Sequence, residues 1–271
     1  MIVDYHMHLR DEAGEIKFAP QAVGPFLETA IARGVEEIAF TEHVYYFRQT
    51  AEIWDVPYLS DRCVHDLDVY CDAVLEAKRA GLPVKLGIEV DYIGELQPRL
   101  AELLQPYPFD FRLGSVHWLD RLAVDMSPGV WEMMTVDEVW ERYAEALCEL
   151  AVSGTVDVLA HPDLAKIFGR RPAPQLLAEL HERIAMVVGA AGLAVEVSTA
   201  GLRKPVGELY PDADLLRACV GKGAPVTLAS DAHEPELVGA DFDHALVHAR
   251  AAGCSTIAVF DGGQMSLEPL G

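Results

Sequence analysis

Two histidines near the start of the chain have the spacing of a pair of metal ligands. His6 and His8 lie in Asp4-Tyr5-His6-Met7-His8, directly after the apolar residues Met1-Ile2-Val3. Because successive side chains of a β-strand point to opposite faces, both imidazoles would point the same way at the end of a strand. Neutral imidazole is a ligand for zinc, iron and manganese. A single pair of this kind is more often a surface or core feature, so a metal site needs further ligands.

Further histidines and carboxylates follow short apolar segments along the chain. In order, they are Glu42, His43, Glu89, His117, His161, Asp231 and His233. Imidazole and carboxylate together suit divalent transition metals. Structural histidines should occur without regard to the ends of strands. The repeated position after apolar segments therefore favours one shared metal site.

The segments that must position these ligands alternate between two kinds, short apolar and longer amphipathic. Strands are expected at 2–5, 37–40, 84–88, 111–115, 156–159, 193–197 and 225–229, with an eighth at 256–260 that carries no obvious ligand. Helices are expected near 21–33, 61–80, 95–104, 136–152, 174–190, 212–221 and 239–252. Asp61 and Asp137 are plausible N-caps, and Gly192 is a plausible helix end. This alternation is typical of a parallel α/β fold, and a single domain spanning 1–271 suits an α/β barrel.

In such a barrel, the loops after the strands gather on one face and carry the reactive side chains. The least regular segments, each directly after an expected strand, are 9–20, 44–60, 118–134 and 198–211. We expect them to form the loops of that face. The ligands listed above, which follow different strands, would then meet at one point.

Composition limits the partners of the protein. The net charge of −22 disfavours nucleic acid and anionic membrane surfaces, so a phosphate must be drawn by local positive charge. Five cysteines without CxxC spacing, and no recognisable signal peptide, indicate reduced thiols in a cytoplasmic protein. No apolar run approaches the ~20 residues of a membrane span. The sequence also lacks GxGxxG, P-loop and GxSxG motifs, which gives little support to a nucleotide cofactor or a serine nucleophile.

Six motifs, in order and over essentially the whole chain, resemble those of the polymerase and histidinol phosphatase (PHP) family. They are Asp4-Tyr5-His6-Met7-His8, Thr41-Glu42-His43, Glu89, Gly114-Ser115-Val116-His117, Ala160-His161-Pro162-Asp163 and Ser230-Asp231-Ala232-His233. The resemblance implies an α/β fold of the distorted (β/α)7, TIM-like barrel type that binds two or three divalent ions and hydrolyses phosphoesters. The segment Ser198-Thr199-Ala200-Gly201-Leu202-Arg203-Lys204-Pro205 is similar to the histidinol-phosphatase branch.

The resemblance also implies how the ligands are shared. One metal would be held by His6, His8, Glu89 and Asp231. Glu89 would bridge to a second metal bound by His117 and His161. A third would be held by His43, His233 and one residue of the loop after His8. Many family members have a histidine in that loop, whereas this chain offers Glu12, with Asp11 as the alternative. The ions are expected to be Zn, Fe or Mn.

Several side chains are candidates for contact with a substrate. Arg203 suits bidentate phosphate binding, with Lys204 as a point charge beside it. Arg170 is equally well explained as closing over the phosphate or as a surface charge. Glu42 would meet an amino group of the substrate or support the imidazole of a ligand.

The predicted function is that of a metal-dependent phosphatase. The most favoured substrate is L-histidinol phosphate, a small-molecule phosphate ester whose hydrolysis gives histidinol for histidine biosynthesis. Asp231 or His233 is expected to carry the proton to the leaving alkoxide. The alternatives are nucleotides, oligonucleotides or phosphotyrosyl protein as substrates, and a non-catalytic metal-binding module. The sequence does not indicate an oligomeric state.

Overall fold

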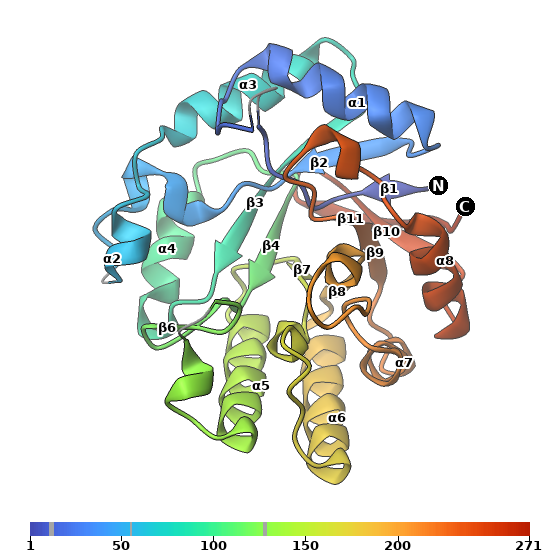
Figure 1. Cartoon of the computed structure of the whole chain (residues 1–271). Helices are drawn as coiled ribbons and strands as arrows, with labels where there is room; N and C mark the ends of the chain where they lie inside the picture. The colour runs from blue at the N-terminus through green and yellow to red at the C-terminus, as the bar shows by residue number, and fades with distance from the viewer. Residues whose placement is uncertain (11–13, 55, 127–128) are drawn as a thin grey trace.

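Seven parallel strands form the centre of the computed structural model, which describes residues 1–10, 14–54, 56–126 and 129–271 (Figure 1). In spatial order they are β1 (Val3–Asp4), β2 (Glu37–Phe40), β3 (Val84–Asp91), β4 (Phe111–Ser115), β7 (Val158–Leu159), β8 (Ala194–Ser198) and β9 (Val226–Ala229). The two ends of this sheet meet, because the Tyr5 N–H donates to the Leu228 carbonyl at 3.0 Å and the His8 N–H to the Ala232 carbonyl at 2.8 Å. The expected distorted (β/α)7 barrel is confirmed.

Helices surround the barrel on its outside (Figure 1). They are α1 (Val23–Ala32), α2 (Pro57–Ser60), α3 (Leu67–Arg79), α4 (Gln97–Leu104), α5 (Val136–Val152), α6 (Pro174–Ala191), α7 (Ala213–Gly221) and α8 (Phe242–Ala251). Short 3-10 turns lie between them at Pro20–Ala22, Val44–Tyr46, Arg48–Thr50, Gly94–Leu96, Val130–Glu132, Leu164–Lys166, Ala200–Arg203 and Pro235–Leu237. No described helix is long and apolar enough to cross a membrane.

Two of the expected N-caps are wrong. Asp66, not Asp61, caps α3 by accepting a hydrogen bond from the Asp68 N–H. Thr135, not Asp137, caps α5 in a capping box with Glu138. In both cases the true cap has extended backbone geometry directly before the first helical residue. The expected end of α6 at Gly192 is confirmed, because this residue has the left-handed backbone that glycine adopts without strain.

The expected eighth strand forms β10 (Thr256–Asp261), but it lies outside the barrel sheet. It pairs antiparallel with β11 (Gln264–Pro269), which the sequence did not indicate. The ring of Phe260 lies 4.9 Å from that of Phe111 and 6.1 Å from that of Tyr5. The backbone N–H groups of Gly262 and Gly263 donate to Asp110, the residue before β4. The β10–β11 hairpin therefore packs against the end of the barrel where the strands begin.

The opposite end, where the strands finish, carries the irregular segments that were expected after β2, β4 and β8. The segment after β4 folds into a small hairpin of β5 (Trp118–Leu119) and β6 (Leu122–Ala123). The segment after β2 contains two 3-10 turns and α2. The segment after β8 is held by backbone hydrogen bonds between Ser198 and Tyr210. These loops stand around the ends of the strands that carry the expected ligands.

Candidate metal centre

The predicted ligands come from the ends of six strands. His6 and His8 follow β1, His43 follows β2, and Glu89 lies within β3 because that strand continues to Asp91. The others follow β4, β7 and β9, and they are His117, His161, Asp231 and His233. The parallel arrangement brings all of these segments to one end of the barrel, so residues far apart in sequence become neighbours.

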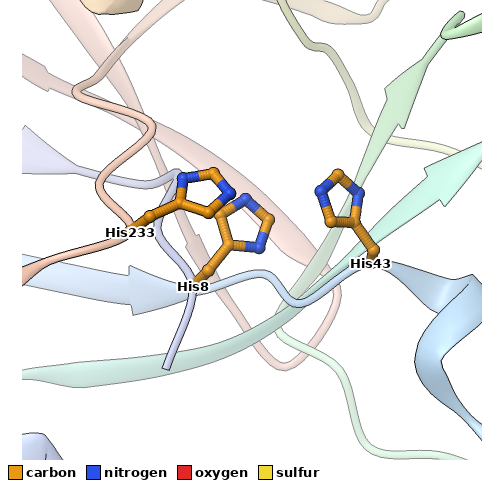
Figure 2. A group of neighbouring side chains, drawn as sticks. All are labelled: His8, His43 and His233. Atoms are coloured by element: carbon orange, nitrogen blue, oxygen red, sulfur yellow. The ribbon is translucent and has the colours of Figure 1, made fainter. Parts of the chain in front are cut away.

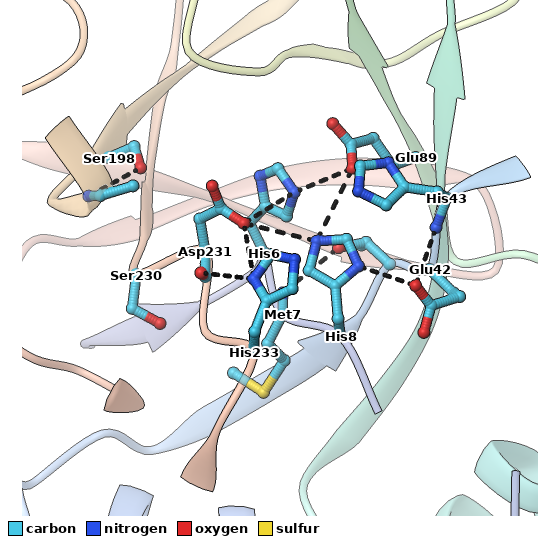
Figure 3. Close-up of polar contacts among 12 residues, drawn as sticks. His6, Met7, His8, Glu42, His43, Glu89, Ser198, Ser230, Asp231 and His233 are labelled. Carbon is cyan, nitrogen blue, oxygen red and sulfur yellow. Dashed lines mark hydrogen bonds and ion pairs between the residues drawn. The ribbon is translucent and has the colours of Figure 1, made fainter. Parts of the chain in front are cut away.

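The carboxylate of Glu89 points toward the imidazoles of His6, His8 and His43 (Figure 3). Its Oε2 atom is 2.7 Å from His43 Nδ1 and 3.3 Å from His6 Nε2. Its Oε1 atom is 3.4 Å from His161 Nε2 and 3.7 Å from His117 Nε2. The two carboxylate oxygens therefore face different sets of imidazoles, which is the geometry that a bridging ligand requires.

Asp231 is a second carboxylate of the cluster and lies close to three of its imidazoles. Its Oδ1 atom lies 3.4 Å from His8 Nε2, 3.7 Å from His6 Nε2 and 3.6 Å from His233 Nδ1. The rings of His8 and His233 have centroids 4.1 Å apart, and those of His8 and His43 lie 4.5 Å apart (Figure 2). One aspartate thus joins the two β1 histidines to the residues after β9.

The donor atoms of this cluster fit metal ions. His6 Nε2, His8 Nε2, His43 Nδ1 and both oxygens of Glu89 are buried and make no hydrogen bond to any described residue. Buried polar atoms without partners are costly and rare in folded proteins. Divalent ions would satisfy them, and four sets have ligand atoms within 4.8 Å of one another: His8, His43 and His233; His6, Glu89 and His161; His6, His8 and Asp231; and His43, Asp91 and His117. The cluster is therefore suited to several ions.

A second layer of carboxylates orients the imidazoles. His6 Nδ1 lies 2.8 Å from Glu196, and His117 Nδ1 lies 2.7 Å from Asp91. His8 Nδ1 lies 2.9 Å from Glu42. Each contact fixes one ring nitrogen, so the Nε2 atom of these histidines faces the centre of the cluster. Such partners are typical of histidines that bind metals.

Charge within the cluster shifts its pKa values. Burial alone would lower the pKa of His117, but the carboxylate of Asp91 outweighs it and raises the pKa to about 10. Burial would raise the pKa of Glu89, but the imidazoles of His43 and His6 hold it well below its ordinary value. In the absence of ions, protonated imidazoles thus balance the carboxylates. Metal ions need the neutral ring, so binding them must release protons.

Glu42 does not have the position expected of a substrate contact. Its side chain is fully buried, and its carboxylate meets His8 and, at 2.6 Å, the guanidinium of Arg10. Burial would raise its pKa, but Arg10 and His8 outweigh burial and hold the pKa well below its usual range. The alternative role, support of a ligand's imidazole, agrees with these contacts.

The candidate basic residues differ in position. Lys204 lines a cavity of about 140 Å³ beside His161, Asp231 and His233. Arg203 does not line it; its guanidinium bonds to the Ser230 carbonyl and lies 3.4 Å from the Thr199 carbonyl.

Two further predictions concern Arg170 and the loop after His8. The guanidinium of Arg170 donates to the Trp131 carbonyl at 3.2 Å and lies over the ring of the same residue. Arg170 is exposed and is not among the residues that line the cavity, which favours its interpretation as a surface charge. Glu12 and its alternative Asp11 lie outside the described residues. The ligand from that loop stays a prediction.

Three acidic residues of the site were not identified from the sequence. Asp91 follows Glu89 by two residues in a strand, so the spacing argument used for His6 and His8 would have found it. Glu196 interrupts the buried apolar strand β8, which is also a usable signal. Asp125 lines the cavity, and no local pattern marks it.

The cavity beside the ligands is smaller than another in the molecule. That other cavity, of about 650 Å³, lies between α5, α6 and the β10–β11 hairpin. Its lining is mostly apolar and includes none of the predicted ligands. The chemistry of the donor atoms, not the volume, identifies the site.

Comparison with known proteins identifies the family of this chain. The PHP domain model matches residues 4–200. A probable histidinol-phosphatase of Deinococcus radiodurans is 32% identical over 237 residues, covering 86% of this chain and 88% of that protein. The histidinol-phosphatase of Bacillus subtilis is 24% identical, covering 79% and 88%. The structure of Lactococcus lactis histidinol phosphate phosphatase, complexed with zinc, L-histidinol and phosphate, has a TM-score of 0.75 at 21% identity and covers 98% of both chains. The chain belongs to the PHP domain family.

Proposed function

We propose that this protein is a metal-dependent phosphatase that hydrolyses L-histidinol phosphate to L-histidinol and phosphate. The observation that carries the proposal is the cluster around Glu89, whose buried donor atoms lie close to one another and include five that make no hydrogen bond to a described residue: His6 Nε2, His8 Nε2, His43 Nδ1 and both oxygens of Glu89. The relatives support the substrate, because those of Deinococcus radiodurans and Bacillus subtilis are named as histidinol-phosphatases. The Lactococcus lactis enzyme was solved with L-histidinol and phosphate.

A phosphomonoester resists hydrolysis because its negative charge repels a nucleophile and its alkoxide leaves poorly. When bound, divalent ions neutralise that charge and lower the pKa of water toward ~7. His6, His8, Glu89 and Asp231 would hold the first ion, His117 and His161 the second with Glu89, and His43 and His233 the third.

Other side chains would attract the phosphate and deliver a proton to the leaving group. Lys204 lines the cavity and would attract the phosphate into a protein whose net charge is otherwise strongly negative. His233 is the more exposed of the two expected proton carriers, with 48% of its side chain accessible against 17% for Asp231. Either would deliver a proton to the leaving alkoxide, as expected from the sequence. Glu89 would fix the distance between the ions that it joins.

The remaining predictions concern partners and location. A phosphate ester as substrate follows from the proposed function. The net charge still disfavours nucleic acid as a partner. A cytoplasmic location would agree with a biosynthetic role and with the five cysteines, which are all free thiols.

Turnover of L-histidinol phosphate, measured as release of phosphate, tests the proposal. The purified protein is assayed after dialysis against chelator and again after addition of Zn, Mn or Fe. We expect activity only with metal, and a higher kcat/KM for L-histidinol phosphate than for nucleoside monophosphates or a phosphotyrosyl peptide. Equal activity with and without bound metal would contradict the mechanism. Preference for a nucleotide would contradict the substrate.

A further inference from the structure

A carboxylate outside the predicted ligand set also lines the cavity. Asp125 follows β6 in the loop after β4 and is partly buried. It forms no ion pair within 4 Å with any described basic residue, and it is not one of the residues grouped as potential metal ligands. Other acidic residues of the site have a definite partner; Asp91 meets His117 and Glu196 meets His6. Asp125 is therefore a carboxylate that faces the cavity without a close ion pair to a described residue, although its charge contributes to raising the pKa of His117.

Such a charge is unfavourable for most phosphate esters. The substrate of this site carries up to two negative charges, and a further carboxylate in the same small cavity, beside Glu89 and Asp231, repels it. The repulsion acts on every phosphate ester equally, unless the organic part of the ester carries a positive charge that meets the carboxylate. An unpaired charge in a binding site is a known way to reject the wrong ligand.

The neighbouring walls suit a flat or cationic organic group. Tyr45, Tyr58 and Trp118 line the same cavity as Asp125. The rings of Tyr58 and Trp118 have centroids 5.5 Å apart, and the ring of Tyr45 stacks on His43 at 4.7 Å. Aromatic faces attract cations and also pack against other flat rings. The cavity thus contains a basic residue, Lys204, that could bind the phosphate. Its aromatic residues and Asp125 could bind the organic part of the substrate.

We propose that Asp125 determines specificity by binding the cationic group of the substrate, an amino group or a protonated ring, and by repelling phosphate esters that lack one. The proposal rests on the proposed function, and it adds the residue that would select the cationic part of the substrate. Asp125 touches the substrate but takes no part in the bond that breaks.

The test compares two esters in two variants. Asp125→Asn removes the charge and keeps the shape of the side chain. Asp120→Asn is the matched control, because Asp120 lies in the β5–β6 hairpin just before Asp125, is outside this cavity and pairs with Arg142 on the surface. The esters are L-histidinol phosphate, which carries an amino group, and phenyl phosphate, which is aromatic and has no cation. Bound metal and thermal midpoint are measured for each protein.

With Asp125→Asn, we expect kcat/KM for L-histidinol phosphate to fall about 10- to 100-fold, mainly through KM, as for loss of one partner of a charge pair. With phenyl phosphate, kcat/KM should stay within about twofold or rise. The inhibition constant of L-histidinol should increase and that of inorganic phosphate should not. Asp120→Asn should change none of these values.

An equal fall for both esters, or a loss of bound metal, would overturn the proposal and indicate a structural or ligand role for Asp125. Unchanged kinetics with both esters would overturn it as well. These outcomes leave the proposed function standing, provided that the wild-type protein hydrolyses L-histidinol phosphate. If Asp125→Asn does not fold, Asp125→Glu keeps the charge and should keep the preference for the cationic ester; loss of that preference in a folded Asp125→Glu would count against the proposal.

Discussion

The buried carboxylates at the two ends of the barrel differ in their hydrogen bonding. At the end where the strands begin, Asp110 is buried and accepts hydrogen bonds from the N–H groups of Leu86 and Gly262 and from Lys78 at 2.6 Å. Lys85 and Lys78 also meet Asp261 of the β10–β11 hairpin. At the end where the strands finish, Glu89 is equally buried, yet neither of its oxygens makes a hydrogen bond to a described residue.

This difference assigns different roles to the two ends of the sheet: one contributes to stability and the other to the proposed function. A buried carboxylate that is fully hydrogen-bonded holds structural elements together, here β4 and the hairpin. The Glu89 carboxylate instead faces several imidazoles, whose positive charge balances it in the absence of ions and whose nitrogen atoms could bind ions with it. Substitutions at the two ends should therefore affect different measurements.

The largest effect is expected for Glu89→Gln. The change removes the charge that faces His6, His43, His117 and His161, so we expect kcat/KM to fall ~10³-fold or more, with loss of bound metal. His233→Ala, which alters a ligand of one ion only, should cost less. Metal analysis and steady-state kinetics on L-histidinol phosphate measure both. Glu89→Gln protein that keeps two tightly bound ions and near-normal turnover would exclude the bridging role.

A smaller effect is expected at Arg203, on the same end of the barrel. If its guanidinium turns to the phosphate, Arg203→Ala should lower kcat/KM by a factor that corresponds to ~2–4 kcal/mol of transition-state stabilisation. Arg203→Lys should not restore kcat/KM, because lysine lacks the planar guanidinium that binds phosphate through two hydrogen bonds. Bound metal should be unchanged. Loss of metal instead would mean that Arg203 acts through the Ser230 carbonyl on the neighbouring Asp231, a proposed ligand. Lys204→Ala provides the comparison with a side chain that already lines the cavity.

Asp110→Asn should affect stability alone. An amide cannot accept all of the hydrogen bonds that the carboxylate accepts, and it loses the charge opposite Lys78. We expect the free energy of unfolding to fall by about 1–3 kcal/mol. Urea unfolding measures this change. A loss of kcat/KM greater than about twofold in the folded variant, on the scale of mutant kinetics, would contradict the separation of the two ends.

The smallest effect is expected for Asp261→Asn. Hydrogen bonds from Lys85 and Lys78 lower the pKa of the Asp261 carboxyl, but the side chain is largely exposed. We therefore expect a loss below about 1 kcal/mol that decreases with added salt. Because the folded pKa is lowered, this contribution is present above the ordinary pKa of aspartate and is lost as the pH falls through the folded value. Unfolding at neutral and acidic pH, at low and high salt, checks the prediction. An effect that grows with salt would contradict it.

Much of the candidate site could be predicted because its proposed ligands obey local rules. The two-residue spacing of His6 and His8, and the position of His43, His117 and His161 after apolar segments, are visible without any knowledge of the fold. The same rule would have added Asp91. The N-caps of α3 and α5 were missed, because several acidic or hydroxyl residues precede each helix and only backbone geometry selects one.

By itself, the sequence determined which residues would stand at the ends of parallel strands, because the alternation of side chains along a strand and the direction of the strands are local or repeating properties. Only the tertiary structure decided which of those residues face the centre of the cluster and which orient them. His6 meets Glu196 across 190 positions, and Glu42 turns away from the cavity because Arg10 and His8 occupy its carboxylate. Lys204, rather than Arg203, lines the cavity for a similar reason: the guanidinium of Arg203 is held by the Ser230 carbonyl after β9. Contacts between distant segments depend on how the barrel closes, and no local pattern records them.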